Sequence, residues 1–196
     1  MANDLNSLVS QLLNADTLSA LSSSTGVSQQ DTKKVLTSLI PALLSGANNQ
    51  ATQQSTAQGF LGALTQHANA DTSNIASFFK NVDTVDGSKI INHLLGGQIK
   101  NITNTAAKSN NVKSADVSKI LSAAAPFLMA LLGKQLLSNA KKAKAQTANT
   151  DLVSKLLGSS NISGIASSLL GGSSKKSDDG LDLGDVAKLA SLFLKK

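Results

Sequence analysis

His67 and His93 are the only histidines of the 196-residue chain, and they are its first candidates for acid–base or metal chemistry. Asp71 follows His67 by four residues, and Asp86 lies seven residues before His93. A metal site or a catalytic base would require a second group at a recognised spacing, such as a histidine one helical turn away, and neither histidine has one. The simpler interpretation is a histidine at a helix end or partly buried.

An acidic run near the C-terminus contains the residue type of a calcium loop: Asp178, Asp179, Asp182 and Asp185. The spacing does not fit an EF-hand, and the chain has no Glu to supply the closing bidentate ligand. Carboxylates at the start of a helix are also favoured by the helix dipole, which explains the run without a metal. We therefore expect no metal and no other cofactor.

Five residue types are absent from the chain: Glu, Arg, Trp, Tyr and Cys. Without Cys there is no disulfide, thiolate nucleophile or cysteine metal site, and without Arg there is no bidentate fork for phosphate or guanine. The chain also contains neither a phosphate-binding loop nor a G-x-S-x-G elbow. The sequence therefore predicts a protein that is not an enzyme.

The positive charge is concentrated in the second half of the chain. The formal net charge is +6, but residues 1–98 carry more Asp than Lys, whereas residues 100–155 hold nine Lys and two Asp. Such a segment could bind DNA or RNA phosphates without reading their sequence, or it could be a solvated helix surface. The candidate anion-contacting residues are Lys134, Lys141, Lys142 and Lys144.

Apolar residues recur with a helical period of about 3.6 along most of the chain, and no alternating strand pattern is present. The sequence predicts an all-α helical bundle of about ten helices. Among the expected boundaries, Asp16 and Ser28 begin helices, Gly46 ends one, and Asp86-Gly87 forms a turn.

Two stretches 85 residues apart resemble each other, and each contains one of the two prolines of the chain. Residues 24–43 and 109–128 are identical at seven of 20 positions, and Pro41 aligns with Pro126. A proline within a helix removes a hydrogen bond and meets the carbonyl four residues earlier, here that of Thr37 or Ser122. We expect either a bend at each proline, which we favour, or a new helix beginning there.

The predicted organisation is one helical domain followed by a tethered helix. Residues 1–172 form the domain, with an internal duplication of about 17–46 and 102–137, and residues 173–196 form a linker and a C-terminal amphipathic helix. The apolar face of that helix, a candidate interaction surface, consists of Val186, Leu189 and Phe193, together with Ala190.

Four strings together resemble the longer members of a bacterial family, the YidB-like domains of unknown function. They are TGVSQQDTKKVLTSLIPALLSG at 25–46, GFLGALTQH at 59–67, VDGSKIINHLLGG at 85–97 and VKSADVSKILSAAAPFLMALLGKQ at 112–135. The resemblance implies an all-helical fold and supplies no catalytic or binding residues.

The function that these observations favour is a non-enzymatic interaction or scaffold protein, and self-association is one form that the interaction could take. The alternatives are nonspecific nucleic-acid binding through the Lys-rich second half and a hydrolase whose site is unrecognised. The most apolar stretch, residues 120–132, is shorter than the roughly 20 residues of a membrane helix. We expect a cytoplasmic protein without a transmembrane segment, whose partner is another protein or itself.

Overall fold

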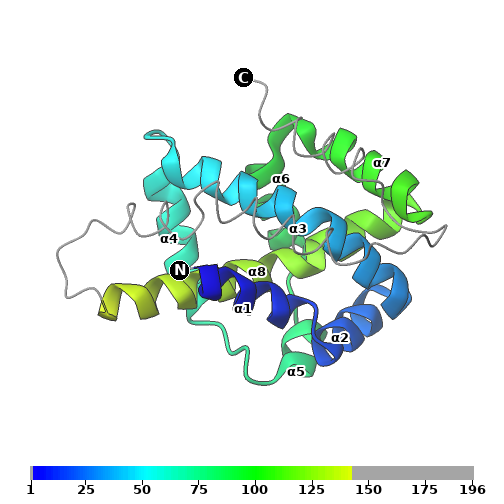
Figure 1. Cartoon of the computed structure of the whole chain (residues 1–196), viewed down its shortest axis with the longest axis horizontal. Coiled ribbons are helices and arrows are strands. Elements are labelled where there is room, and N and C mark those ends of the chain that lie inside the picture. The colour runs from blue at the N-terminus through cyan, green and yellow to red at the C-terminus, as the bar shows by residue number, and fades with distance from the viewer. Residues whose placement is uncertain (1, 143–196) are drawn as a thin grey trace.

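The structure is a computed structural model that describes residues 2–142, with side chains described from residue 5 to residue 139. All regular structure in this part is helical (Figure 1). The helices are α1 (Ala2–Leu12), α2 (Ala15–Thr25), α3 (Gln29–Thr52), α4 (Ala57–Ala68), α5 (Ile75–Lys80), α6 (Thr84–Leu95), the 3-10 turn η1 (Gly96–Gln98), α7 (Ile99–Asn110) and α8 (Ser114–Lys142). The predicted all-α class is confirmed, whereas the count of about ten helices is not confirmed over the described residues.

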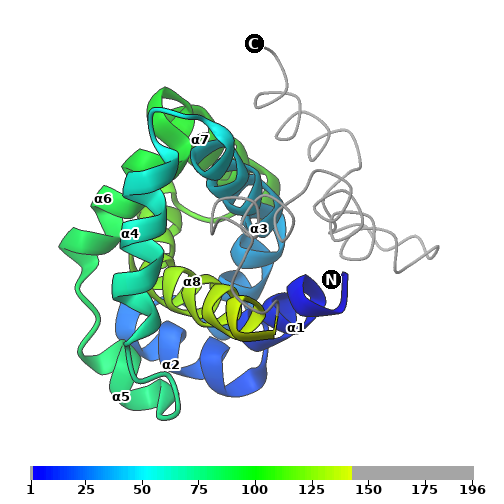
Figure 2. The ribbon, with the colours of Figure 1, turned by 90° about the vertical axis from the view of Figure 1, so that its left-hand side faces the viewer.

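Helix α8 is the centre of the bundle. Helices α4 and α6 pack along it, and α1, α2, α3 and α7 also contact it (Figure 2). Residues 123–132 of α8 are all buried, so this stretch is enclosed on every side. A helix that is apolar all round is stable in water only when other helices cover it, and the arrangement satisfies this requirement.

By length and composition alone, α8 could cross a membrane, because its segment Ser114–Asn139 reaches a mean hydropathy of 1.6. Inside the bundle, however, 78% of the apolar window is buried. The neighbouring helices therefore explain the apolar character of α8.

Pro41 and Pro126 lie inside α3 and α8, and both helices continue through them. The alternative in which a new helix begins at each proline is therefore wrong, while a bend at each proline stays a prediction. Because Pro126 has no N–H, the Ser122 carbonyl loses its helical partner. Gly87 of α6 lies directly against this carbonyl, and a Cβ on Gly87 would overlap it.

Three glycines inside helices mark the points where two helices approach most closely. Gly46 of α3 faces the Leu94 carbonyl of α6, Gly87 of α6 faces α8, and Gly133 of α8 faces the Leu64 carbonyl of α4. At each point an added Cβ would collide with backbone atoms of the neighbouring helix. The predicted helix end at Gly46 and the predicted turn at Asp86-Gly87 are therefore wrong, because α3 continues to Thr52 and α6 begins at Thr84.

The connection between α2 and α3 matches the connection between α7 and α8. Gly26 ends α2 with φ 72°, and Asn111, 85 residues later, ends α7 with φ 53°. Both residues have the left-handed conformation that commonly ends a helix, and Asn is the non-glycine residue that tolerates it best. Ser28 caps α3 as predicted, whereas α2 is capped by Asn14 and not by Asp16.

The 85-residue offset also relates the packing of the α2–α3 pair to the packing of the α7–α8 pair. Helix α2 contacts α3 and α8, and α7 contacts α8 and α3, so each short helix touches both long ones. Val35 and Ile120 are fully buried at matching positions of α3 and α8, as are Thr32 and Val117.

Three phenylalanines attach the short helix α5 to the core. The rings of Phe78 and Phe79 lie 5.2 Å and 5.1 Å from the ring of Phe127 in α8, centroid to centroid. Aromatic pairs at such distances contribute about 0.5–1.5 kcal/mol beyond the area they bury. This contact holds α5 against α8, and α5 also packs on α2.

Candidate functional site

His67 and Asp86 form an ion-pair contact that the sequence did not predict. His67 lies in the last turn of α4, and its Nε2 is 3.4 Å from Oδ2 of Asp86 on α6. In the sequence, Asp71 is the carboxylate nearest to His67 and Asp86 is the one noted near His93, and neither spacing predicted a contact. The contact joins the last turn of α4 to the first turn of α6 and fixes the orientation of the imidazole ring.

Asp71 is occupied by its own loop. Its Oδ1 accepts hydrogen bonds from the Ser73 hydroxyl at 2.6 Å and from the Ser73 N–H at 2.9 Å. These two bonds, and to a smaller extent the positive charge of Lys134, hold the pKa of Asp71 below its usual value of 3.8. Asp71 is therefore a loop-forming carboxylate and does not contact His67 as a base would.

His67 and Asp86 border a cavity of about 340 Å³, which we call the His67 pocket. It is lined by His67, Asp71, Asn74, Ser77, Phe78, Asn81, Val82, Asp83, Asp86 and Pro126. Asp83 caps α6 through the N–H groups of Val85 and Asp86, so its carboxylate also has a structural task. Among the described residues, no group of three or more metal-ligating side chains is assembled. The pocket thus holds one histidine–aspartate pair, and the other two carboxylates of its lining, Asp71 and Asp83, accept hydrogen bonds from residues close to them in the sequence.

His93 borders a different cavity, of about 330 Å³, which we call the α4–α6 pocket. Its lining comes from the end of α3, the following turn, α4, α6 and α8: Gln50, Ser55, Thr56, Gly59, Phe60, Ala63, Ile90, His93, Leu94 and Met129. Phe60, Ile90, Leu94 and Met129 are buried and form an apolar interior, whereas Ser55, Gly59 and His93 are exposed. An apolar interior with a polar rim is typical of a binding pocket.

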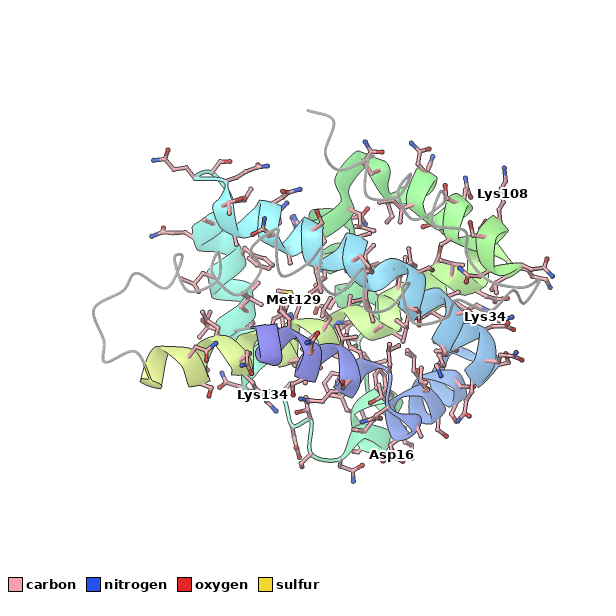
Figure 3. The ribbon with its side chains drawn as sticks, viewed as in Figure 1. Asp16, Lys34, Lys108, Met129 and Lys134 are labelled. Carbon is pink, nitrogen blue, oxygen red and sulfur yellow. The ribbon has the colours of Figure 1, made fainter. Side chains whose placement is uncertain are left out.

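Hydrogen bonds hold the rim of the α4–α6 pocket in place. Gln50 Nε2 donates to the His93 carbonyl at 2.8 Å, which joins the end of α3 to α6. Thr56 Oγ1 donates to the Gln50 carbonyl at 2.9 Å, which joins the turn before α4 to the same point. Figure 3 shows Met129 on α8, the helix that closes the pocket from below. These hydrogen bonds hold the turn before α4 and the end of α3 in a fixed position against α6.

A third hollow lies between α2 and α5 and has a volume of about 700 Å³. Its walls carry small polar side chains, including Ser19, Ser23 and Ser24, with Asp16 at its edge (Figure 3). None of the residues that line this hollow is buried, so it lacks the buried apolar interior of the α4–α6 pocket. It is a weaker candidate for binding than the α4–α6 pocket.

The predicted anion-contacting lysines are only partly described. Lys134 is half-buried, and its Nζ donates to Thr72 Oγ1 at 2.5 Å, so it fastens the loop after α4 to α8 (Figure 3). Lys141 and Lys142 belong to the last turn of α8, but their side chains lie outside the described part, as does the whole of Lys144. Nucleic-acid binding through these residues stays a prediction.

The predicted C-terminal interaction helix, with Val186, Leu189 and Phe193, also lies outside the described residues. The same is true of the expected linker that precedes it.

A sequence model of the family described as "Bacterial protein of unknown function (DUF937)" matches residues 7–135. The chain belongs to this family. The resemblance to the YidB-like domains is thereby confirmed. The matched region of the DUF937 protein runs from α1 into α8, so both pockets lie within it, whereas Lys141, Lys142 and all later residues lie outside.

No curated protein and no solved structure matches this DUF937 protein. Of the residues that line the α4–α6 pocket, the sequence singled out His93 but not the apolar interior, because Phe60, Ile90, Leu94 and Met129 have the spacing of ordinary core residues. A weak signal was available in Gly59 and Gly62, two glycines within one helix, where alanine would stabilise the helix more.

Proposed function

We propose that this DUF937 protein is a non-catalytic helical interaction protein whose α4–α6 pocket receives the apolar side chains of a helical segment. The observation that carries the proposal is the pocket itself: a preformed cavity of about 330 Å³ with an apolar interior and a polar, hydrogen-bonded rim. Its volume suits one or two large side chains. No catalytic step is proposed, because the histidine–aspartate pair lies in the other pocket, where every neighbouring carboxylate has a local partner.

The remaining surface of the described residues supports the choice of this pocket. Only Val85 and Leu137 are large apolar side chains with substantial exposure, at 66% and 37%. Stable protein interfaces usually contain a buried apolar centre, and scattered single residues do not provide one. An apolar partner of the described bundle would therefore gain most by inserting side chains into the α4–α6 pocket.

The expected strength follows from the area that a side chain would bury. A fully buried Leu or Phe contributes about 1.5–3 kcal/mol, so two anchors one helical turn apart would contribute about 3–6 kcal/mol before the cost of association. Such anchoring resembles the general mode in which an amphipathic helix lies in an apolar groove. The contact would be modest in strength and sensitive to a single blocked position.

Gly59 offers a substitution that blocks the pocket without disturbing the fold. It lines the pocket, and a Cβ built on it meets no atom within 4 Å. Gly62, three residues later in the same helix, has equally open space but does not line the pocket. Gly59→Leu should therefore fill the pocket entrance, and Gly62→Leu is the matched control, since both changes improve helix propensity.

The test compares the proteins captured from a bacterial lysate by the full chain and by these two variants. We expect one or more proteins to be retained by the wild type and by Gly62→Leu and to be lost with Gly59→Leu. A second readout is the methyl NMR signal of Met129, one of two methionines in the chain, which should shift when a captured partner is added. Equal capture by both variants would contradict the proposed function.

The scaffold that holds the pocket is, on this proposal, a duplicated unit. The matching caps at Gly26 and Asn111, the matching prolines and the exchange of packing partners between α2–α3 and α7–α8 all support a common origin. Association of the protein with itself is part of the same proposal. Self-association would involve either the α4–α6 pocket or residues after 142, because the described surface carries little exposed apolar area.

A further inference from the structure

We infer that the α4–α6 pocket is occupied by the chain's own residues 183–193, with Phe193 inserted beside Phe60. This inference rests on the proposed function, since it names the first occupant of the proposed binding site. The segment would then act as a built-in competitor, and an external partner would have to displace it.

The distribution of aromatic residues points to Phe193. The chain has five phenylalanines and neither Trp nor Tyr. Phe78, Phe79 and Phe127 pack on one another, and Phe60 lines the α4–α6 pocket. Phe193 is thus the one aromatic side chain of the sequence that the described bundle does not use, and aromatic side chains are the commonest anchors of interfaces.

The chemistry of the pocket interior suits an aromatic side chain. Phe60 can form an edge-to-face pair with a second ring, and the sulfur of Met129 can contact a ring edge. Leu189 precedes Phe193 by four residues, so in a helix the two would project from the same face and could enter the pocket together. The lining contains no Lys or Asp, so this contact would depend on apolar burial and not on charge.

The connecting chain is long enough to reach the pocket from the end of α8. Residues 143–182 separate Lys142 from the segment, and a chain of 40 residues can span up to roughly 130 Å when fully extended. Tethering of this kind gives an effective concentration in roughly the millimolar range. Docking within one chain therefore requires only a weak intrinsic affinity.

The first experiment observes the Met129 methyl group in the full chain. Phe193→Ala should move its signal, because the ring current of a neighbouring aromatic ring is lost, and Gly59→Leu should also move it. Leu192→Ala is the matched control, since Leu192 lies off the apolar face formed by Val186, Leu189 and Phe193. An unchanged Met129 signal in Phe193→Ala would overturn the inference.

The second experiment uses the absence of cysteine from the native chain. A cysteine pair, Ser55→Cys at the rim with Lys196→Cys at the chain end, should form a disulfide within one molecule when diamide is added as the two-electron oxidant. The rate should fall by about tenfold or more when Phe193→Ala is added. Raised salt should leave the rate unchanged, because the contact is apolar.

The control pair replaces the rim cysteine with Lys108→Cys, an exposed position on α7 toward the opposite end of the bundle (Figure 3). It should react slowly and should not respond to Phe193→Ala. Equal rates for the two pairs would overturn the inference. A disulfide-linked dimer in place of the intramolecular product would overturn docking within one chain and would identify a second copy as the occupant.

Failure of this inference is distinguishable from failure of the proposed function. If Phe193→Ala changes neither the Met129 signal nor the disulfide rate, while Gly59→Leu still abolishes partner capture, the pocket binds partners but not its own segment. If the inference is correct, Phe193→Ala should increase partner capture, because it removes the competitor.

Discussion

Replacing Thr32 by valine is expected to stabilise the protein, although most core substitutions destabilise. Thr32 lies in the first turn of α3 with a fully buried side chain. Its Oγ1 has no hydrogen-bond partner among the described residues. Val117 occupies the matching position in the first turn of α8, 85 residues later, and is equally buried. The bundle thus already contains the proposed side chain at the corresponding site.

The magnitude follows from the unsatisfied hydroxyl. A buried polar group without a partner costs about 1–3 kcal/mol, and valine has nearly the same shape as threonine, so its introduction leaves no cavity. The two residues also differ little in helix propensity. We therefore expect Thr32→Val to raise the free energy of unfolding by about 1–2 kcal/mol, where each kcal/mol corresponds to roughly 2–4 °C in Tm for a chain of this size.

Urea unfolding followed by far-ultraviolet circular dichroism is the suitable assay, because the chain has no Trp or Tyr for fluorescence. Thr17→Val is the matched control. Thr17 is also fully buried, but its Oγ1 donates to the Gln11 carbonyl at 2.8 Å. Valine should cost about 1 kcal/mol there, because a formed hydrogen bond is lost. The two substitutions are chemically identical and should have opposite signs.

Equal destabilisation by Thr32→Val and Thr17→Val would contradict this prediction. That outcome would show that the Thr32 hydroxyl finds a partner in solution. The reciprocal change, Val117→Thr, provides a further check, since it should introduce an unsatisfied hydroxyl into α8 and lower stability by about 1–3 kcal/mol.

Two further predictions concern helix contact and pH. Gly87→Ala should lower the midpoint of urea unfolding, because the added methyl group would overlap the Ser122 carbonyl. Gly62→Ala should instead raise the free energy of unfolding by about 1 kcal/mol, because an added Cβ there meets no neighbouring atom. Similar effects of the two substitutions would contradict the close contact between α6 and α8. Since the folded-state pKa of Asp71 is lowered, its contribution to stability should be present above the usual value of 3.8 and lost as the pH falls through the folded value. Acid titrations of unfolding should therefore show a smaller loss in Asp71→Asn than in the wild type, and identical acid profiles would exclude this role.

The sequence predicted the start of α3 correctly but misplaced the cap of α2 and the end of α3. Ser28 was identified because N-caps depend on local hydrogen bonds, which a short stretch of sequence contains. Gly46 and Gly87 were misread as stops, since a glycine can end a helix or allow close helix contact. Only the positions of the Leu94 and Ser122 carbonyls, far away in the sequence, decide between these roles.

The sites were less predictable than the fold for the same reason. His67 meets Asp86 across 19 residues, whereas the nearer Asp71 is turned toward Ser73. The nearest carboxylate in the sequence was therefore the wrong partner, because the turn after α4 uses its oxygens locally. Phe60 and Met129 likewise read as core residues, and only the packed helices show that a cavity remains between them.

The position of the two pockets follows from the arrangement of the helix pairs. Residues 53–98 lie between the α2–α3 pair and the α7–α8 pair and include α4, α5 and α6. Most of the lining of the His67 pocket and the α4–α6 pocket comes from this intervening segment, and Pro126 and Met129 of α8 close them. The paired helices thus supply a rigid support, with its prolines and close glycine contacts. The intervening segment supplies most of the side chains that line each pocket. Substitutions in α4 and α6 should therefore change binding, whereas substitutions in α3 and α7 should mainly change stability.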